Sequence, residues 1–360
     1  MAAKEKKCLI VRAPNWIGDA VLCTPALGAL RRLYPVAAIT VLAKPSVAPV
    51  FQNSPDVTDI MVYDDKDAHK GIAGRVRLSG EIRKRRFDVA VLFQNAFDAA
   101  FLSFISGIPE RIGFARDLRG PLLTKAVTAT KEIKAAHQVY YYLHLIEAMG
   151  GAVSGNASPR PRLYVTRDER KWAKAYLKTY GLAGRPLVGV SPGASYGQAK
   201  RWLPERFAKA VAELGRRHNA ATIIFGAQED VEAVSIVERL LPFPCVNCAG
   251  KLTLRQFMAL LIELDIFIAN DSGPMHLGSA LGVPTIGIFC STDPALTGPV
   301  GAHARAVLNR VPCSPCFKRT CRFGHYDCLA SVSVDMVIEA AEALMRASEK
   351  GAKGAVHASS

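Results

Sequence analysis

Four polar segments of the sequence carry residue types that could do chemistry, and each follows an apolar run. In ANDSGPMH, Asp271, Ser272 and Gly273 follow the strand-like run DIFIAN, and the proline behind them predicts the start of a helix. The exposed amides of a helix start bind anions such as a pyrophosphate. Asp271 and Ser272 could also cap that helix, and His276 could be an ordinary buried histidine.

The segment SPGASYGQAKRW follows a second apolar run and combines small residues with two cations. Small residues such as Gly193 and Ser195 let backbone amides approach an anion closely. Lys200 and Arg201 could hold a phosphate, or they could lie on a solvated approach to the next helix. Trp202 is expected to lie in the core.

A third segment, APNWIGDAVL, lies between the first predicted strand and the first predicted helix, where open α/β sheets bind ligands. Asp19 could accept a proton from a substrate hydroxyl. It could equally be the N-cap of the helix, where an aspartate suits the helix dipole. Asn15 and Trp16 are unusual residues for a mere connecting loop and are candidates for ligand contact.

The fourth segment, FGAQED, follows another predicted strand. Gly226 lies at the end of that strand, and Glu229 and Asp230 open the next helix. Either carboxylate could accept hydrogen bonds from ribose hydroxyls, as acidic residues after strands do in nucleotide-binding folds. Either could instead stabilise the first turn of the helix through its dipole.

Four of the nine cysteines lie close together late in the chain, in CSPCFKRTCRFGHYDC. The spacing resembles two pairs of zinc ligands, but the second pair is spaced more widely than is usual. Reduced cysteines that pack the loop are therefore expected, and a metal site is the lesser alternative, with the ligands Cys313, Cys316, Cys321 and Cys328. Three cations of this segment could face an anionic ligand: Lys318, Arg319 and Arg322.

Strands and helices are predicted to alternate along the chain. Short apolar runs predict strands at 7–13, 37–44, 59–65, 89–93, 111–114, 186–193, 221–227, 265–271 and 284–290. Helical patterns between them include 20–30, 99–107, 137–151, 166–181, 204–219, 231–241, 254–264 and 332–347. This alternation is typical of doubly wound parallel sheets, although the first strand-to-helix turn has one glycine and no GxGxxG fingerprint.

The alternation is interrupted by GAVSGNASPRPRL, which is rich in Gly, Ser and Pro and marks an interdomain connection. We therefore predict one Rossmann-like domain at 1–160, a second at 161–347 and a disordered tail rich in Gly, Ala and Ser at 348–360. The cleft between two such sheets is a natural place for a ligand.

The charge of the chain favours an anionic partner. Its 360 residues hold 46 Lys and Arg against 31 Asp and Glu, a net charge of +15, and cations cluster at residues 83–86 (RKRR). Simple solubility is the alternative, and nucleic-acid binding is not expected because no RNA-recognition or zinc-finger motif is present. Neither a membrane-spanning apolar run nor a signal-peptide core is visible, so we expect a cytoplasmic protein, in which disulfides are a poor default.

Four segments, in the order APNWIGDAVLCTPAL, SPGASYGQAKRWLPERFA, FGAQED and ANDSGPMHLGSALGVPTIGIF, resemble the ADP-heptose–lipopolysaccharide heptosyltransferases, glycosyltransferase family 9. The type that they resemble most is heptosyltransferase II, and the cysteine segment is similar to segments of some bacterial members. The resemblance runs from about residue 8 to 345. It implies a GT-B architecture, with two Rossmann-like domains across a cleft, the acceptor on the first, the donor nucleotide mainly on the second, and the terminal helix packed back towards the first.

The resemblance also implies roles for residues at matching positions. Asp19 matches the general base proposed for the family, and Lys200 matches its phosphate-binding lysine. The residues implied to bind the donor are Ser195, Tyr196, Gly226, Glu229 (or Asp230), Asp271, Ser272, Gly273 and His276. Asn15 and Trp16 then lie on the acceptor side. Pro274 departs from the family pattern, in which Leu or Thr is expected, but a first-turn proline leaves the amide site intact.

The implied reaction moves L-glycero-D-manno-heptose from ADP-heptose to the first heptose of heptosyl-Kdo2-lipid A, with inversion of the anomeric carbon. No essential divalent metal is expected, because Lys200 and the amides after Asp271 could stabilise the departing diphosphate. The acceptor lies in the cytoplasmic leaflet of the inner membrane, where basic side chains favour peripheral contact. Heptosyltransferase I or III is a near alternative, and a non-catalytic protein that binds a nucleotide or zinc is an alternative of another class.

Overall fold

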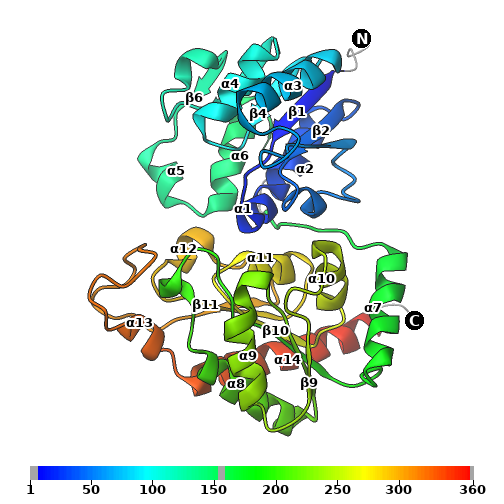
Figure 1. The fold of residues 1–360 in the computed structure, drawn as a ribbon, viewed down its shortest axis with the longest axis vertical. Helices are drawn as coiled ribbons and strands as arrows, with labels where there is room; N and C mark the ends of the chain where they lie inside the picture. Colours follow the sequence, from blue (N-terminus) through cyan, green and yellow to red (C-terminus); the bar gives the residue numbers. More distant parts are fainter. Residues whose placement is uncertain (1–6, 153–158, 357–360) are drawn as a thin grey trace. The chain divides into compact units, whose positions relative to one another are not determined.

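Two parallel β-sheets organise the chain (Figure 1). The computed structural model describes residues 7–152 and 159–356, and within these ranges each sheet has six strands. Contacts divide the chain into two units, Met1–Tyr164 and Val165–Ser360. The prediction of two doubly wound α/β sheets is confirmed. The middle of the predicted connection, residues 153–158, lies outside the described residues.

The sheet of the first unit has the strand order β3-β2-β1-β4-β5-β6. The strands are β1 (Cys8–Arg12), β2 (Ala38–Ala43), β3 (Asp59–Val62), β4 (Val89–Leu92), β5 (Glu110–Phe114) and β6 (Lys125–Val127). From β1 the chain moves outward to β3 and then returns to the other side of β1 with β4. The point between β1 and β4, where the direction of winding reverses, is where sheets of this kind bind ligands at the carboxyl ends of their strands.

Helices bury the sheet of the first unit. They are α1 (Ile17–Leu22), α2 (Thr24–Leu33), α3 (Gly71–Lys84), α4 (Phe97–Ile105), α5 (Lys131–Ala135) and α6 (Gln138–Ala148). One core joins Ile10, Leu42 and Leu92 of the strands to α3 and α4. The alternate strand residues, such as Val11 and Val41, are equally buried, and α2 and α6 pack on one another. Burial on both faces explains why these strands read as continuous apolar runs.

The sheet of the second unit repeats the same winding, in the order β12-β11-β10-β7-β8-β9. Its strands are β7 (Leu187–Ser191), β8 (Ala221–Ile224), β9 (Cys245–Asn247), β10 (Ile266–Asn270), β11 (Thr285–Ile288) and β12 (Ala304–Val307). β7 and β10 are parallel neighbours, with Val190 opposite Ile268 and Ser191 opposite Ala269. The winding reverses between these two strands, so their carboxyl ends define the second switch point.

The helices of the second unit are α7 (Arg167–Thr179), α8 (Pro204–His218), α9 (Val231–Leu240), α10 (Leu254–Leu261), α11 (Gly273–Ala280), α12 (Pro294–Thr297), α13 (Asp327–Ala330) and α14 (Val334–Val356). α14 lies against α8 and against β10, β11 and β12 of its own unit. That it packs back towards the first domain stays a prediction. α14 continues into the predicted tail, and residues 357–360 lie outside the described residues.

Membrane-spanning helices are absent from the described part of the chain, where no helix is both long enough and apolar enough to cross a bilayer.

The start of α7 carries a complete capping box. Thr166 is the N-cap, and its side chain and that of Glu169 make the two reciprocal hydrogen bonds of the box. The Glu169 carboxylate also accepts two 2.7 Å hydrogen bonds from the guanidinium of Arg255 on α10. The hydrogen bonds from Arg255, aided by those from Thr166, lower the pKa of Glu169 from 4.5 to about 2. One carboxylate therefore joins the helix cap to a neighbouring helix.

This geometry predicts a defined acid sensitivity. Because the pKa of Glu169 is lower in the folded chain than in the unfolded one, its stabilisation is complete above about pH 4.5 and is lost as the pH falls towards 2. Glu169→Gln should therefore lower the urea-unfolding midpoint near neutral pH and make it fall less steeply below pH 4.5. Glu232→Gln, which changes an exposed carboxylate on α9, is the matched control. Identical acid profiles for the wild type and Glu169→Gln would contradict this account.

Candidate functional site

The loops that follow β7 and β10 meet at the switch point of the second unit. The first, which we call the β7 loop, covers residues 192–203 and contains a short 3-10 turn at Gln198–Lys200. The second begins at Asp271, directly after β10, and leads into α11. Because β7 and β10 are parallel neighbours, both loops leave the same edge of the sheet.

A buried ion pair joins these two loops. The Nζ atom of Lys200 lies 2.5 Å from Oδ2 of Asp271, and the Asp271 side chain is almost fully buried. The hydroxyl of Thr292, from the loop after β11, donates a 2.6 Å hydrogen bond to the same carboxylate oxygen. Sequence reasoning placed Lys200 and Asp271 in separate motifs and missed Thr292. The signal for Thr292 was its place just after the strand PTIGIFC, the same kind of position that identified Asp271.

The side chain of Asn270 fixes the shape of the β7 loop. It is fully buried at the end of β10. Its Oδ1 accepts a 2.9 Å hydrogen bond from the backbone N–H of Trp202, and its Nδ2 donates a 2.7 Å bond to the carbonyl of Pro192. Both ends of the loop are thus held to one residue. Trp202 itself is buried, as predicted, and its indole N–H donates to the carbonyl of Val332.

Two cations lie close to one aromatic ring in the β7 loop. The Nζ atom of Lys200 lies 4.7 Å from the centre of the Tyr196 ring, and the guanidinium of Arg319 lies 5.3 Å from it. The Tyr196 hydroxyl donates a 2.9 Å hydrogen bond to the carbonyl of Phe317. Ser195, beside this tyrosine, is exposed. Positive charge is therefore concentrated around the Tyr196 ring.

Arg319 and Phe317 belong to the cysteine loop, residues 311–326, which packs against the β7 loop. The Ala199 N–H donates to the Arg319 carbonyl at 2.9 Å, and the Phe317 N–H donates to the Ser291 carbonyl at 2.7 Å. Gly197 has a φ of 152°, and a Cβ there would lie 2.5 Å from the Arg319 carbonyl oxygen. Only glycine fits this close contact. The cysteine loop therefore packs tightly against the β7 loop and holds its backbone in place.

The cysteines of this segment are free thiols. Among the described residues, no three His, Cys, Asp or Glu side chains are arranged to hold a metal ion, and this includes Cys313, Cys316, Cys321 and Cys328. Backbone N–H groups, that of Tyr326 foremost, lower the pKa of the Cys321 thiol, whereas burial raises the pKa of Cys328. That these cysteines are reduced and pack the loop stays a prediction.

The start of α11 differs from the capped helix that the sequence allowed. Ser272 occupies the N-cap position but makes no side-chain cap, because its hydroxyl donates to the Asn270 carbonyl at 3.1 Å. The Asp271 carboxylate pairs with Lys200. The interpretation of Ser272 as a capping side chain is thus wrong. Gly273 is the first helical residue, beside the ion pair, and His276 is buried one turn further on.

The two carboxylates after β8 occupy different surroundings. Asp230 is buried, its Oδ2 accepts a hydrogen bond from the Ala227 N–H at 3.1 Å, and burial raises its pKa. A Cβ at Gly193 would lie 2.1 Å from the Asp230 carboxyl carbon, so this side chain packs directly on the β7 loop. Glu229 is exposed. Gly226 packs on α9, since a Cβ there would lie 2.9 Å from Val234.

The turn after β1 forms a second polar site in the first unit. Trp16, an exposed side chain, is the N-cap residue of α1, and Asp19 is the third helical residue. The interpretation of Asp19 as the N-cap is therefore wrong. Its negative charge, after burial itself, raises the pKa values of Tyr142 and Cys23, so the carboxylate lies near α6 and the end of α1.

Arg12, which sequence reasoning missed, anchors this turn. Its guanidinium donates to Oδ1 of Asn15 at 2.8 Å and to the carbonyl of Ala13 at 2.6 Å, and burial lowers its pKa to about 10. Asn15 is thereby held in place. The sequence did carry a signal for Arg12, because it is a charged residue at the end of the apolar run CLIV, which predicts a buried strand.

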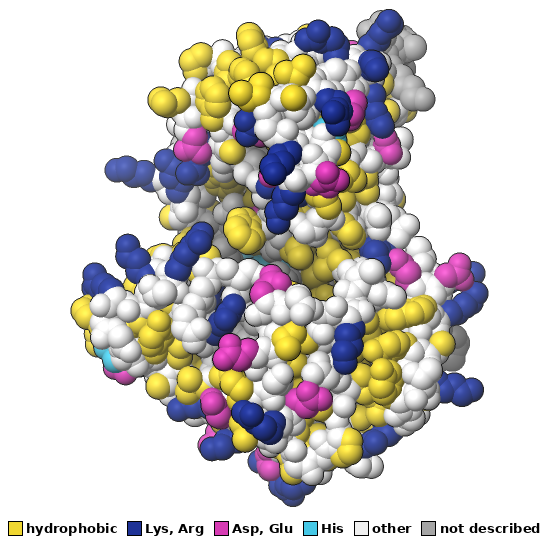
Figure 2. All heavy atoms as spheres, in the orientation of Figure 1, with side chains coloured by type: hydrophobic (Ala, Val, Ile, Leu, Met, Phe, Trp, Pro, Cys, Tyr) yellow, Lys and Arg dark blue, Asp and Glu magenta, His cyan; other side chains and the backbone are white. Residues whose placement is uncertain are grey.

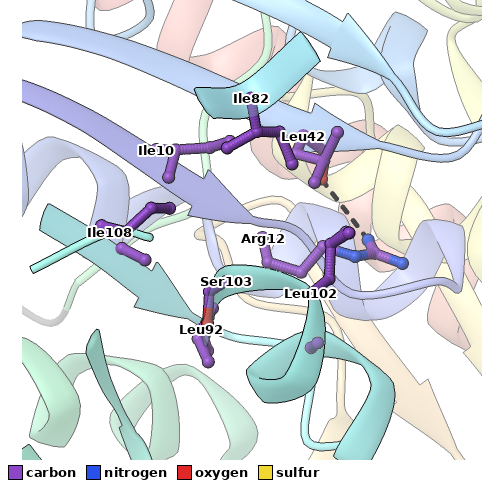
Figure 3. Close-up of a pocket in the computed structure, with 10 residues that line it drawn as sticks. Ile10, Arg12, Leu42, Ile82, Leu92, Leu102, Ser103 and Ile108 are labelled. Carbon is purple, nitrogen blue, oxygen red and sulfur yellow. Dashed lines mark hydrogen bonds between the residues drawn. The ribbon is translucent and has the colours of Figure 1, made fainter. Parts of the chain in front are cut away.

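Arg12 also borders a small internal pocket (Figure 3). Aliphatic side chains such as Ile10, Leu92 and Leu102 line most of it. The guanidinium of Arg12 lies beside the Leu42 carbonyl, to which it donates, and the Ser103 hydroxyl donates to Ala100. Since these polar groups already have partners, the pocket is a packing gap under α3 and α4, and the polar turn after β1 is the better site.

Comparisons with known proteins give the same family along most of the chain. The model of the family described as Glycosyltransferase family 9 (heptosyltransferase) matches residues 75–327. Lipopolysaccharide heptosyltransferase 2 of Escherichia coli (strain K12) is 27% identical over 343 residues, which cover 94% of this chain and 98% of that relative.

Two solved structures resemble the chain over nearly its whole length. The structure of E. coli ADP-heptose LPS heptosyltransferase II superposes with a TM-score of 0.81 at 26% identity, covering 95% of this chain and 99% of that one. The glycosyl transferase family 9 protein from Veillonella parvula DSM 2008 gives a TM-score of 0.86 at 27% identity, covering 96% and 99%.

The two hydrogen bonds of the Asn270 side chain to the β7 loop should stabilise the fold. Asn270→Ala leaves the buried N–H of Trp202 and the carbonyl of Pro192 without this partner, which should lower the free energy of unfolding by roughly 1–3 kcal/mol in urea titrations. Asn309→Ala is the matched control, because Asn309 donates a similar bond to Ser331 from an exposed position. It should cost at most about 0.5 kcal/mol. An equal loss of unfolding free energy in the two variants would show that the Asn270 hydrogen bonds contribute no more than an exposed one.

Proposed function

The chain belongs to glycosyltransferase family 9, the heptosyltransferases, and from this premise we propose the donor, the acceptor and the residues that act on them. The enzyme is a heptosyltransferase of lipopolysaccharide core synthesis, and its fold matches the GT-B members of the family. We propose that it transfers L-glycero-D-manno-heptose from ADP-heptose to the first heptose of heptosyl-Kdo2-lipid A. The relatives named heptosyltransferase 2 or II support this choice of acceptor.

The observation that carries the proposed donor site is the ion pair of Lys200 and Asp271 at the start of α11. A diphosphate in this place would meet the ammonium of Lys200 and the first amides of α11, from Gly273 on. Its oxygens would compete with Asp271 for Lys200, and charge-assisted hydrogen bonds of this kind are strong. Asp271 then has the role of holding Lys200 ready between ligands.

The remaining donor contacts follow from the surrounding loops. Ser195 is exposed and Tyr196 supports Lys200, so both suit the phosphates. We assign the ribose hydroxyls to Glu229, because its side chain is exposed whereas that of Asp230 is buried. Gly226 and the buried His276 shape the site through packing.

Asp19 acts as the general base in the proposed mechanism. Its carboxylate takes the proton of the acceptor hydroxyl, and that oxygen forms the new bond to the anomeric carbon of the heptose. The bond from this carbon to ADP breaks on the opposite face, so the centre inverts and ADP leaves with the electron pair. Lys200 and the α11 amides stabilise the charge that develops on the diphosphate, and the proposal assigns no step to a divalent metal.

We propose that the first unit, with Asn15 and Trp16 beside Asp19, binds the acceptor, and that the second unit binds the donor. The exposed indole of Trp16 and the Asn15 amide, which Arg12 orients, are suited to a sugar. The acceptor is anchored in a bilayer, so we place the enzyme at the cytoplasmic face of the inner membrane, in peripheral contact with it.

A transfer assay tests the proposed reaction. With ADP-heptose and heptosyl-Kdo2-lipid A, ADP should be released and the acceptor should gain the mass of one heptose. Kdo2-lipid A, which lacks heptose, should not react. Transfer to Kdo2-lipid A but not to heptosyl-Kdo2-lipid A would indicate heptosyltransferase I specificity. If neither acceptor led to ADP release, the donor assignment would be rejected.

Replacement of the proposed base should stop the chemistry without harming donor binding. Asp19→Asn should lower the turnover number by at least about 100-fold, because general-base catalysis is lost. The ADP dissociation constant, measured by calorimetry, should stay near the wild-type value. Asp335→Asn, at an exposed first-turn aspartate of α14, is the control and should remain active. Near-normal turnover of Asp19→Asn would exclude this base.

Replacement of the proposed phosphate ligand should weaken both donor binding and catalysis. Lys200→Met should lower kcat/KM by roughly 100- to 1,000-fold, as the loss of one transition-state donor does. This single variant leaves Asp271 buried without its cation, which could destabilise the fold. The double variant Lys200→Met/Asp271→Asn removes both charges, so its effect on ADP binding can be measured in a folded protein. Lys209→Met, at an exposed lysine of α8, is the control. Tight ADP binding by the well-folded double variant would contradict the proposed role.

A further inference from the structure

Helix α4 of the first unit is apolar on both of its faces. Its inner residues, among them Ala99 and Leu102, are buried in the core. Its outer face carries Phe97, Phe101 and Phe104, whose side chains are 47%, 38% and 49% exposed. These three residues are spaced by four and three positions, so they share one side of the helix. A helix that is apolar all round is normally covered on every side.

The neighbouring helix α3 extends this outer face. Ile72 and Val76, one turn apart, are 79% and 61% exposed. Arg75 of α3 pairs with Asp98 of α4 at 2.8 Å, and Arg83 donates a hydrogen bond to the Ile105 carbonyl, so the helices lie side by side. We call the surface formed by Ile72, Val76, Phe97, Phe101 and Phe104 the α3/α4 face. Figure 2 shows hydrophobic side chains gathered over this end of the first unit.

Cations border the α3/α4 face. Residues 71–86 contain six Lys or Arg and one Glu, and four of the cations form the run RKRR at 83–86. Arg83 lies on the same side of α3 as Ile72 and Val76, because it follows Val76 by seven residues, about two helical turns. The guanidinium of Arg111 lies 5.3 Å from the centre of the Phe104 ring. The α3/α4 face is therefore apolar at its centre and positively charged at its margin.

This combination fits one kind of partner. Exposed aromatic and aliphatic side chains enter the boundary between headgroups and acyl chains, while Lys and Arg bind anionic headgroups. A second copy of the chain fits less well, since a symmetric contact would bring two positively charged patches together. We propose that the α3/α4 face docks the enzyme on an anionic phospholipid surface.

The proposed docking rests on the proposed function in one respect, which is that the acceptor is itself lipid-anchored. An enzyme held at the surface by its first unit would meet the acceptor in two dimensions, which raises its effective concentration. The face contains no residue of the proposed donor or acceptor site. Its loss should therefore raise the KM for acceptor in vesicles and leave turnover on detergent-dispersed acceptor unchanged.

Vesicle flotation tests the docking directly. Wild-type protein should float with vesicles of phosphatidylethanolamine and phosphatidylglycerol at low salt and much less with phosphatidylcholine alone. Phe97→Ser/Phe104→Ser removes exposed apolar area, and Lys84→Glu/Arg86→Glu reverses two exposed charges. Each double variant should bind at least about tenfold more weakly, since each basic residue near an anionic membrane contributes measurably. The matched control, Leu240→Ser/Arg239→Glu, changes exposed residues of α9 and should bind as wild type.

Several outcomes would overturn the proposal. They are failure of the wild type to float with the anionic vesicles, wild-type binding by the Phe97→Ser/Phe104→Ser variant, and equal losses in the α9 control. A dimer seen by light scattering that this phenylalanine variant abolishes, with flotation unchanged, would make the face an interface between copies. Flotation needs neither ADP-heptose nor acceptor, so a failure of heptose transfer would reject the proposed reaction and leave the docking result standing.

Discussion

A carboxylate buried at the end of a strand requires a cation, and in the second unit that requirement organises the candidate site. Asp271 meets Lys200 at 2.5 Å and the Thr292 hydroxyl at 2.6 Å. Lys200 can reach this place because Asn270 holds both ends of the β7 loop and the Arg319 backbone holds its middle. An unpaired buried charge is costly, so the loop, the strand end and the cysteine loop stabilise one another through this pair. An anionic ligand at this place would compete with Asp271 for the ammonium group of Lys200.

The central part of the fold was predictable from the sequence, and so was the edge strand β3, but the other three edge strands were not. Strands such as β7 and β10 are buried on both faces and read as apolar runs. Those three edge strands are short and partly exposed, with the sequences KAV (β6), CVN (β9) and ARAV (β12). Their strand conformation depends on pairing with a neighbour in the sheet, so their local pattern carried no signal.

The positions of the site residues were predictable, and their partners were not. Asp271, Lys200 and Asp19 stand out because each lies in a polar segment after an apolar run. The partners depend on loop paths that periodicity does not describe: Lys200 pairs with a residue of another motif, and Arg319 reaches Tyr196 from the cysteine loop. The capping interpretation of Asp19 was wrong because α1 begins two residues earlier, at Ile17. The net positive charge was equally visible, but its concentration beside exposed phenylalanines needed the structure.

The central claim is that the donor nucleotide binds at the switch point between β7 and β10. The most direct measurement is a crystal structure of the enzyme with ADP. The diphosphate should lie at the first amides of α11, with Lys200 Nζ moved from Asp271 to a phosphate oxygen and the ribose beside Glu229. ADP bound instead at the turn after β1 in the first unit, with the Lys200–Asp271 pair intact, would contradict it.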